Sequence, residues 1–354
     1  MRLLENELYR NDVAAAADCG ITWDKLRNSS IAVSGATGLI GSFLTDVIMH
    51  KNKADGLNCK VIALGRSIRK AEERFREYMN DPCFSFVECD ICNADTIKID
   101  GDVDYFFHAA SNTHPVAYAT DPIGTITVNV IGLQNLLEIA RSHNAKRFLF
   151  ASSNEIYGEN RGDTEKFAED YCGYINCNTL RAGYPESKRV SEALCQAYIK
   201  QYDMDIVIPR LTRSFGATLL SSDTKAISQF LKKGVNGEDI VLKSAGNQFY
   251  SFTYVSDAVT GVLYCLTEGE KGEAYNIATE SCDITLKDLA NAIADHVGTK
   301  VVFDIPEATE AAGFSVVTKA VLDGSKLEKL GWKADFDIRK GIAHTIEIMK
   351  AMEG

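Results

Sequence analysis

The sequence predicts an α/β protein with a doubly wound parallel sheet and a smaller C-terminal α/β domain. Three observations support this. Short apolar runs alternate with segments of helical periodicity over the first two hundred or so residues. A glycine-rich turn joins the first apolar run to the following helix. After Arg210 the alternation loosens into longer loops and mixed elements.

The expected elements follow one another as repeated βα units. Residues 1–27 form a helical extension ahead of the first strand. The expected strands are Ile31–Ser34, Lys60–Leu64, Phe84–Glu88, Tyr105–His108, Arg147–Ala151 and Asp205–Pro209. The expected helices are Ser42–His50, Arg69–Asn80, Thr125–Ser142 and Pro185–Tyr202. This pattern predicts a parallel sheet with helices on both faces, in a domain of residues 28–209 to which 245–270 also contribute. Residues 210–354 then form mainly a second domain, interleaved with the first.

Composition limits the classes of protein. The 354 residues, 45% of them hydrophobic, suffice for one large or two interleaved domains. There is no unbroken run of eighteen apolar residues and no apolar signal-peptide core, so we expect a cytoplasmic protein without a membrane span. The ten cysteines and six histidines are dispersed, which predicts reduced thiols and no metal site. A net charge of −11 argues against a nucleic-acid binder and requires a local cluster of cations for any anionic substrate.

The glycine turn, Ser-Gly-Ala-Thr-Gly-Leu-Ile-Gly at 34–41, is typical of dinucleotide binding in a Rossmann-type domain. Gly35 permits a tight turn, Gly38 leaves room for a pyrophosphate, and Gly41 lets the helix pack closely. The helix N-terminus offers free N–H groups to the phosphates. The alternative is an ordinary loop. The turn residues expected at the cofactor are Gly35, Thr37, Gly38, Leu39, Ile40 and Gly41.

The end of the second strand bears on the choice between NAD and NADP. An acidic residue there would bind the 2′-hydroxyl of NAD, but the chain has Gly65 and Arg66. A guanidinium suits a 2′-phosphate, so Arg66 favours NADP. The alternative is that Arg66 stacks on adenine and the cofactor is NAD.

A catalytic group is expected around Tyr184 and Lys188, which are one helical turn apart in Tyr-Pro-Glu-Ser-Lys. A nearby ammonium would lower the pKa of the phenol, and a phenolate can take a hydroxyl proton while hydride leaves for nicotinamide. Ser153 follows the strand Arg147–Ala151 and can hydrogen-bond the substrate oxygen. The alternatives are a solvated helix face for the Tyr/Lys pair and ordinary turn chemistry for Ser153.

From about residue 30 to the C-terminus the chain resembles the extended short-chain dehydrogenase/reductase superfamily, which includes nucleotide-sugar epimerases, dehydratases and decarboxylases. The resemblance covers the glycine turn, Cys-Asp-Ile at 89–91, His-Ala-Ala-Ser at 108–111, Val-Asn-Val-Ile-Gly at 128–132, Ser153, the Tyr184/Lys188 pair, and 252–258, 275–278 and 326–332. It implies that the cofactor stays bound while a sugar hydroxyl is oxidised, the ketone is transformed, and the ketone is usually reduced again. It also implies a further set of cofactor residues: Asp90, Ile91, Ala109, Ala110, Ser111 and Asn129.

Within this superfamily the pattern is most similar to the UDP-glucuronate decarboxylases. The segment 171–189 keeps their register, with Arg181 three residues before Tyr184. Glu155, in Ser-x-Glu-x-Tyr-Gly, also fits that group, and the resemblance implies that it is catalytic.

The chain departs from that pattern at four positions in the expected substrate pocket. Arg213 replaces a usual Asn, Tyr250 a usual Arg, and Lys225 another usual Arg. Asn154 stands where sugar 4,6-dehydratases have an Asp, and an amide cannot protonate a leaving hydroxide.

The sequence therefore predicts an NAD(P)-dependent nucleotide-sugar decarboxylase with a nucleotide diphosphate sugar as substrate. The alternatives are a 4-epimerase or 4,6-dehydratase, and a non-catalytic NAD(P)-binding sensor. The sensor is disfavoured because such proteins typically lose the Tyr or the Lys. Candidate cations for the carboxylate or diphosphate are Arg181, Arg210, Arg213 and Lys225, each with a surface salt bridge as the alternative.

A homodimer is also expected. Family members pair the helices that correspond to Thr125–Ser142 and Pro185–Tyr202 into an intersubunit bundle. The alternative is burial of both helices within one subunit.

Overall fold

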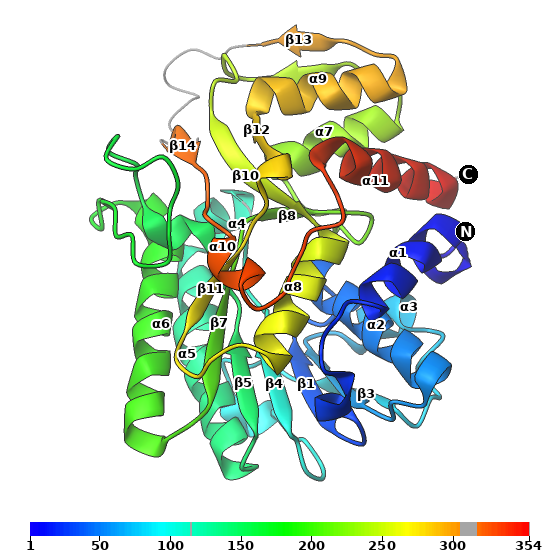
Figure 1. Cartoon of the computed structure of the whole chain (residues 1–354), viewed down its shortest axis with the longest axis vertical. Helices are drawn as coiled ribbons and strands as arrows, with labels where there is room; N and C mark the ends of the chain where they lie inside the picture. The colour runs from blue at the N-terminus through cyan, green and yellow to red at the C-terminus, as the bar shows by residue number, and fades with distance from the viewer. Residues whose placement is uncertain (114, 305–316, 354) are drawn as a thin grey trace.

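The computed structural model describes residues 1–113, 115–304 and 317–353 (Figure 1). Its centre is a parallel sheet of eight strands in the order β11-β7-β5-β4-β1-β2-β3, with β6 beside β7. The strands are β1 (Ser30–Ser34), β2 (Lys60–Gly65), β3 (Phe84–Glu88), β4 (Tyr105–His108), β5 (Arg147–Phe150), β6 (Ser152–Ser153), β7 (Ile206–Leu211) and β11 (Ala274–Ile277). Because β1 pairs with both β2 and β4, the strand order reverses between β1 and β4. This switch point is where ligands bind in such sheets.

Helices cover both faces of this sheet, which confirms the Rossmann-type fold. They are α2 (Leu39–Asp55), α3 (Ile68–Arg74), α5 (Pro122–Ser142), α6 (Gly183–Tyr202) and α8 (Val255–Thr267), while the short α4 (Pro115–Thr120) packs on α5. Alternate residues of β1 serve opposite faces. Ile31 and Val33 belong to the core cluster that includes α2 and α8, whereas Ala32 belongs to the cluster with α5 and α6. Burial on both faces explains why the strands are short and almost wholly apolar.

One expected helix is shorter than its periodicity suggests. Arg69–Asn80 was expected, but α3 ends at Arg74 and residues 75–80 form turns. Phe75 is fully buried, stacks with Tyr78 and packs at a tilt against Phe84, so aromatic packing bends the chain back toward β3. Tertiary packing here overrides a helical pattern.

The second lobe stands above the carboxyl ends of the large sheet (Figure 1). Its strands are β8 (Arg213–Phe215), β9 (Ile240–Leu242), β10 (Phe249–Tyr254), β12 (Asp283–Thr285), β13 (Val301–Phe303) and β14 (Lys319–Ala320). Its helices are α7 (Ala226–Val235), α9 (Leu286–Val297) and α11 (Ile338–Glu353), while α10 (Ser325–Glu328) packs on β11 and α8. The chain returns to the large sheet through α8 and β11. The sequence predicts that residues 245–270 contribute to the first domain. Of this segment, α8 packs on the large sheet, whereas β10 pairs in the second lobe with β8, β12 and β14.

The N-terminal extension bridges the two lobes. Helix α1 (Glu7–Ala17) packs against α2, α8 and α11. On one side the Tyr9 hydroxyl donates to Asp46 of α2 at 2.5 Å. On the other side Asp12 accepts from Tyr254 of β10 at 2.5 Å and contacts Nδ1 of His344 at 2.8 Å. Polar contacts of buried groups thus fix the lobes relative to each other.

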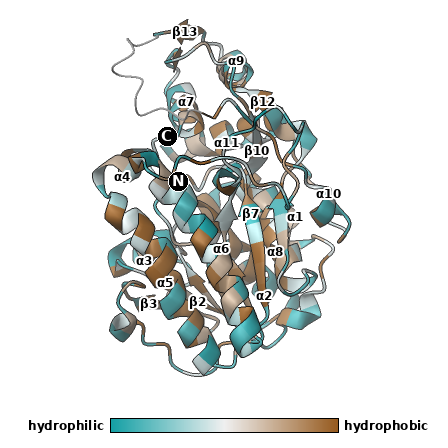
Figure 2. Ribbon diagram, turned by 90° about the vertical axis from the view of Figure 1, so that its left-hand side faces the viewer, coloured by the Kyte–Doolittle hydropathy of each residue, from teal (hydrophilic) through white to brown (hydrophobic). Residues whose placement is uncertain are grey.

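Helix α5 is the one helix in the described part of the chain that is long and apolar enough, by length and composition, to cross a membrane. The core helix of a globular fold passes the same test, so this is weak evidence. In this fold α5 packs on β4, β5 and α6. Figure 2 shows α5 and α6 side by side on the outside of the protein.

Candidate active site

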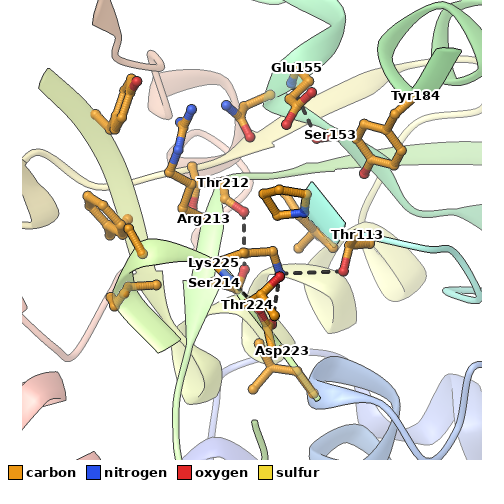
Figure 3. A pocket seen from close by; sticks show the side chains of 18 of the residues that line it. Thr113, Ser153, Glu155, Tyr184, Thr212, Arg213, Ser214, Asp223, Thr224 and Lys225 are labelled. Atoms are coloured by element: carbon orange, nitrogen blue, oxygen red, sulfur yellow. Dashed lines mark hydrogen bonds and ion pairs between the residues drawn. The ribbon is translucent and has the colours of Figure 1, made fainter. Parts of the chain in front are cut away.

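A cavity of about 750 Å³ lies between the carboxyl ends of the large sheet and the second lobe. The cofactor-side residues that line it are Gly35, Gly38, Leu39, Ile40, Gly41, Ala109 and Ser111. The opposite lining includes Ser153, Asn154, Glu155, Arg181, Tyr184, Lys188, Arg213, Lys225 and Tyr250 (Figure 3). The fold therefore brings together most of the residues that the sequence nominated, although they come from both lobes.

The glycine turn divides its tasks among the three glycines. Gly35 has φ +72°, and a Cβ there would lie 2.7 Å from the backbone N of Ala110. A Cβ on Gly41 would lie 2.5 Å from the carbonyl oxygen of Gly35. A Cβ on Gly38 would meet only that same oxygen, at 3.2 Å, and would otherwise point into open space. Gly35 and Gly41 thus build the turn, while Gly38 at the N-cap of α2 leaves room in the cavity.

The loop after β4 forms the part of the cavity wall next to the glycine turn. Ala109 and Ser111 line the cavity, whereas Ala110 packs against the glycine turn. Ser111 Oγ donates to Asn129 Oδ1 at 2.9 Å. Asn129 was expected to line the cofactor, but it is fully buried and outside the cavity. Its amide donates to Thr125 O and Ser187 Oγ, so it braces α5 against α6.

Four other expected cofactor residues do not line this cavity, namely Thr37, Arg66, Asp90 and Ile91. Arg66 follows β2 and is exposed. Asp90 and Ile91 follow β3, the neighbouring strand, and Ile91 packs against Gly132 of α5. The ends of β2 and β3 lie at the same edge of the sheet as the glycine turn, because the strands are parallel.

Ser153, Tyr184 and Lys188 meet at one wall. Tyr184 lies in the first turn of α6 and is 6% exposed, and Lys188 is 2% exposed one turn later. Lys188 Nζ donates to Ala151 O at 2.7 Å and lies 6.0 Å from the centroid of the Tyr184 ring. Arg189 donates to the carbonyl oxygens of Ile156 and Gly173, which ties the Ser153 turn to α6. The fold therefore places hydroxyl, phenol and ammonium around one point.

The sequence predicts that Lys188 lowers the pKa of Tyr184, but in the structure the pKa of Tyr184 is raised. Burial raises the pKa of Tyr184 above its ordinary value, and the Glu155 carboxylate raises it further. Hydrogen bonding to Ser153 and the charge of Arg181 act in the opposite direction. Burial also lowers the pKa of Lys188, to about 7. The reason is that desolvation penalises the charged form of both groups.

Glu155 and Arg181 form an ion pair beside Tyr184. Arg181 Nη2 contacts both carboxylate oxygens, at 2.9 and 2.8 Å. The guanidinium also lies over the ring of Tyr118, 4.8 Å from its centroid. Tyr118, in turn, stacks on Tyr184 with ring centroids 5.0 Å apart. Tyr118 lies on α4, whose six residues are too few for a periodic signal, so sequence reasoning missed it.

Arg213 and Tyr250 face each other across the paired strands β8 and β10. The guanidinium carbon lies 3.6 Å from the centroid of the Tyr250 ring. Arg213 Nη1 is buried and has no hydrogen-bond partner in the described parts of the chain. Burial lowers the pKa of Arg213.

The other two candidate cations are held by acids. Lys225, at the N-cap of α7, contacts Asp223 at 3.1 Å and Thr113 at 3.4 Å (Figure 3). Arg210 was expected at the substrate, but it lies outside the cavity and is 8% exposed. It pairs with Glu192 at 2.7 Å and donates to the Tyr157 hydroxyl and to Glu169 O. Arg210 therefore has a structural role, because its donors are already occupied.

Comparison with known proteins gives three results. The sequence pattern of the NAD dependent epimerase/dehydratase family matches residues 31–278. UDP-glucuronic acid decarboxylase 6 of Arabidopsis thaliana is 30% identical over 315 residues, which cover 89% of this chain and 87% of that protein. UDP-glucuronic acid decarboxylase 1 of Danio rerio is 30% identical over 317 residues, which cover 90% of this chain and 72% of that protein.

Solved structures show the same fold. UDP-glucose 4-epimerase of Thermotoga maritima superimposes with a TM-score of 0.79 at 21% identity, covering 92% of this chain and 100% of that one. A dTDP-glucose 4,6-dehydratase of Streptomyces venezuelae, solved with NAD bound, superimposes with a TM-score of 0.78 at 24% identity. The match covers 91% of this chain and 97% of that one.

Proposed function

The chain belongs to the NAD dependent epimerase/dehydratase family, and from that premise we propose that it is a nucleotide-sugar decarboxylase that oxidises its substrate transiently at C4 of the sugar. The observation that carries the proposal is the convergence of Ser153, Tyr184 and Lys188 on the cavity that the glycine turn also lines. The relatives named above as UDP-glucuronic acid decarboxylases support UDP-glucuronate as the substrate to test first.

The residues present fit a bound dinucleotide. Gly38 leaves open space at the N-terminus of α2, where backbone N–H groups can receive a pyrophosphate. Ala109, Ser111 and Lys188 line the same cavity. The dinucleotide would supply the hydride acceptor.

Tyr184 is the proposed acid–base. Its oxygen takes the proton of the C4 hydroxyl during oxidation and returns a proton to the C4 oxygen when the ketone is reduced. Ser153 donates a hydrogen bond to that oxygen in both states. Lys188, fixed on Ala151 O, places its ammonium behind the phenol.

Loss of carbon dioxide follows from the ketone. With C4 oxidised, the C5 carboxylate is β to a carbonyl, so the C5–CO₂ bond can break with its electron pair passing to the C4 oxygen. Ser153 stabilises the charge on that oxygen. A proton added at C5 then restores the ketone. Asn154 lines the cavity but cannot act as an acid toward a leaving hydroxide, which disfavours dehydration.

For the cofactor we propose NAD. Arg66 alone favours NADP, since it forms no ion pair within the described residues. Glu88, however, ends β3 directly opposite Gly65 and accepts from Ile68 N–H at 3.0 Å. That carboxylate supplies an acidic group at the end of β2, where it would repel a 2′-phosphate. The dehydratase of the same fold was solved with NAD. Mass spectrometry of the dinucleotide released by denaturing the purified protein decides between the two.

The function is tested by incubating the purified protein with a panel of nucleotide sugars and weighing the products. We expect UDP-glucuronate to lose carbon dioxide and give a UDP-pentose. A product of unchanged mass would instead establish an epimerase, and loss of water would establish a dehydratase.

A further inference from the structure

The cavity wall beside Tyr184 carries more positive charge than negative. Two guanidinium groups, Arg181 and Arg213, lie near one carboxylate, Glu155. We propose that Arg213 binds an anionic group on the sugar itself, and that Tyr250 is the residue that positions it. This inference rests on the proposed function and assigns the specificity of that same site.

Arg213 has a buried Nη1 that finds no hydrogen-bond partner among residues 1–113, 115–304 and 317–353, whereas Arg181 and Arg210 both have carboxylate partners. A buried cation without a partner is costly, and the cost is recovered when an anion binds. A guanidinium presents its N–H groups in a planar fork that matches a carboxylate.

The Tyr250 ring, on which the Arg213 guanidinium stacks, is held firmly in place. The Tyr250 ring is 5% exposed, and its hydroxyl donates to Val317 O at 2.5 Å. Its strand β10 is paired on both sides. A ring held in this way fixes the guanidinium that stacks on it at 3.6 Å through a cation–π contact. Arg213 is therefore preorganised for an anion.

Arg213 also lies in the part of the cavity where the sugar is expected to react. In Figure 3 Arg213 borders the same part of the cavity as Glu155 and Ser153, and the Lys225–Asp223 pair lies apart from them. Lys225, with the N-terminus of α7, offers the diphosphate a separate place. An anion at Arg213 is therefore next to the reacting carbons. In a nucleotide sugar this is a carboxylate on the hexose ring.

The test compares UDP, UDP-glucuronate and UDP-xylose by calorimetry on the protein with its cofactor bound. Every protein compared, including the one called wild type here, also carries Tyr184→Phe, so that UDP-glucuronate is bound without being turned over. UDP-xylose keeps the nucleotide, the diphosphate and a pyranose ring but lacks the carboxylate. Arg213→Leu should weaken UDP-glucuronate about ten- to a hundredfold, as expected for a lost charged hydrogen bond. It should leave UDP and UDP-xylose within about twofold, since they lack its anion. Arg213→Gln gives a second, polar version of the same test if the leucine variant does not fold.

Two further variants complete the design. Lys225→Met, at the diphosphate end, should weaken all three ligands together. Tyr250→Leu removes the ring and should weaken UDP-glucuronate selectively. Tyr250→Phe keeps the ring but loses the hydrogen bond to Val317 O, so it should weaken UDP-glucuronate less than Tyr250→Leu does.

The inference is overturned if the wild type binds UDP-xylose as tightly as UDP-glucuronate, or if the Arg213 variants weaken all three ligands equally or none. Equal binding of UDP-glucuronate by Tyr250→Leu and wild type would remove the positioning role. Failure of the proposed function is distinct. If no carbon dioxide is released but the selective loss of binding is seen, the carboxylate site stands and decarboxylation does not.

Discussion

Lys188 donates a 2.7 Å hydrogen bond to the carbonyl oxygen of Ala151, at the junction of β5 and β6. The bond fixes α6 to the end of the central strands and holds an ammonium in a site that is almost wholly buried. The Phe150 ring lies 4.6 Å from Nζ on one side, and the Tyr184 ring lies on another. The fold therefore disfavours the charged form of Lys188.

The buried ammonium predicts that replacing Lys188 stabilises the fold while lowering turnover. Burial lowers the pKa of Lys188 to about 7, below the 10.5 of a free lysine. Between these values the unfolded chain binds more protons, so this group makes the free energy of unfolding rise with pH above about 7. Lys188→Met should abolish that rise, raise the unfolding midpoint below about pH 7, and lower turnover. Thermal unfolding of both proteins across this range is the measurement, and parallel curves would contradict it.

The glycine turn predicts opposite outcomes for two neighbouring glycines. Gly38→Val puts a side chain into the cavity, and its Cβ meets only the carbonyl oxygen of Gly35, at 3.2 Å, so the variant should fold and lose its cofactor. Gly35→Ala needs φ +72° and strikes Ala110, so it should be destabilised, by roughly 1–3 kcal/mol for the strained backbone alone. Cofactor content and the unfolding midpoint separate the two effects. Full cofactor occupancy in Gly38→Val would place the pyrophosphate elsewhere.

Glu155 predicts a shift in pH dependence. Its carboxylate raises the pKa of Tyr184, and it also neutralises Arg181, which lowers that pKa. Glu155→Gln removes the first effect and leaves Arg181 unpaired, so both changes lower the pKa of the phenol. The acidic limb of the pH profile for sugar oxidation should move to lower pH, even if the maximal rate falls. Single-turnover formation of the reduced nicotinamide at 340 nm is a suitable probe. An unmoved or raised limb would separate Glu155 from Tyr184.

The exposed apolar side chains of α5 and α6 predict a homodimer. Ile123 is 75% exposed, Val190 50% and Ile131 44%. Apolar groups gathered on two adjacent helices are typical of an interface between copies. Val190→Glu should shift sedimentation at micromolar concentration toward the monomer. Val302→Glu, an exposed apolar site on β13, should not. A wild type that sediments only as monomer would refute the dimer.

The sequence was most informative where function needs a local pattern. The glycine turn, the Tyr184/Lys188 spacing and Ser153 after a strand are each set by a few consecutive residues, and these residues line one cavity. Contacts between distant segments could not be read in this way. The stacking of Tyr118 on Tyr184 and the brace made by Asn129 depend on how α4, α5 and α6 pack.

Charged residues were the hardest to assign, because one arginine looks like another in a sequence. Arg210 lies near the end of β7, where the sequence predicts a substrate-binding residue. Its guanidinium, however, is bound to Glu192 and to the Tyr157 hydroxyl. Arg213, three residues later, has a buried nitrogen without a hydrogen-bond partner in the part of the chain that the structure describes. Only the positions of the neighbouring acids distinguish a structural cation from one available to a ligand.

The most direct test of the central claim uses UDP-glucuronate carrying deuterium at C4 of the sugar. Transient oxidation predicts that the deuterium leaves as hydride and returns within the same site, so the UDP-pentose formed should keep it while carbon dioxide is released. Tyr184→Phe should reduce this turnover by about 100- to 10,000-fold, the usual contribution of acid–base catalysis. Loss of the deuterium to solvent, a product that retains its carboxylate, or near-normal turnover by Tyr184→Phe would contradict the account.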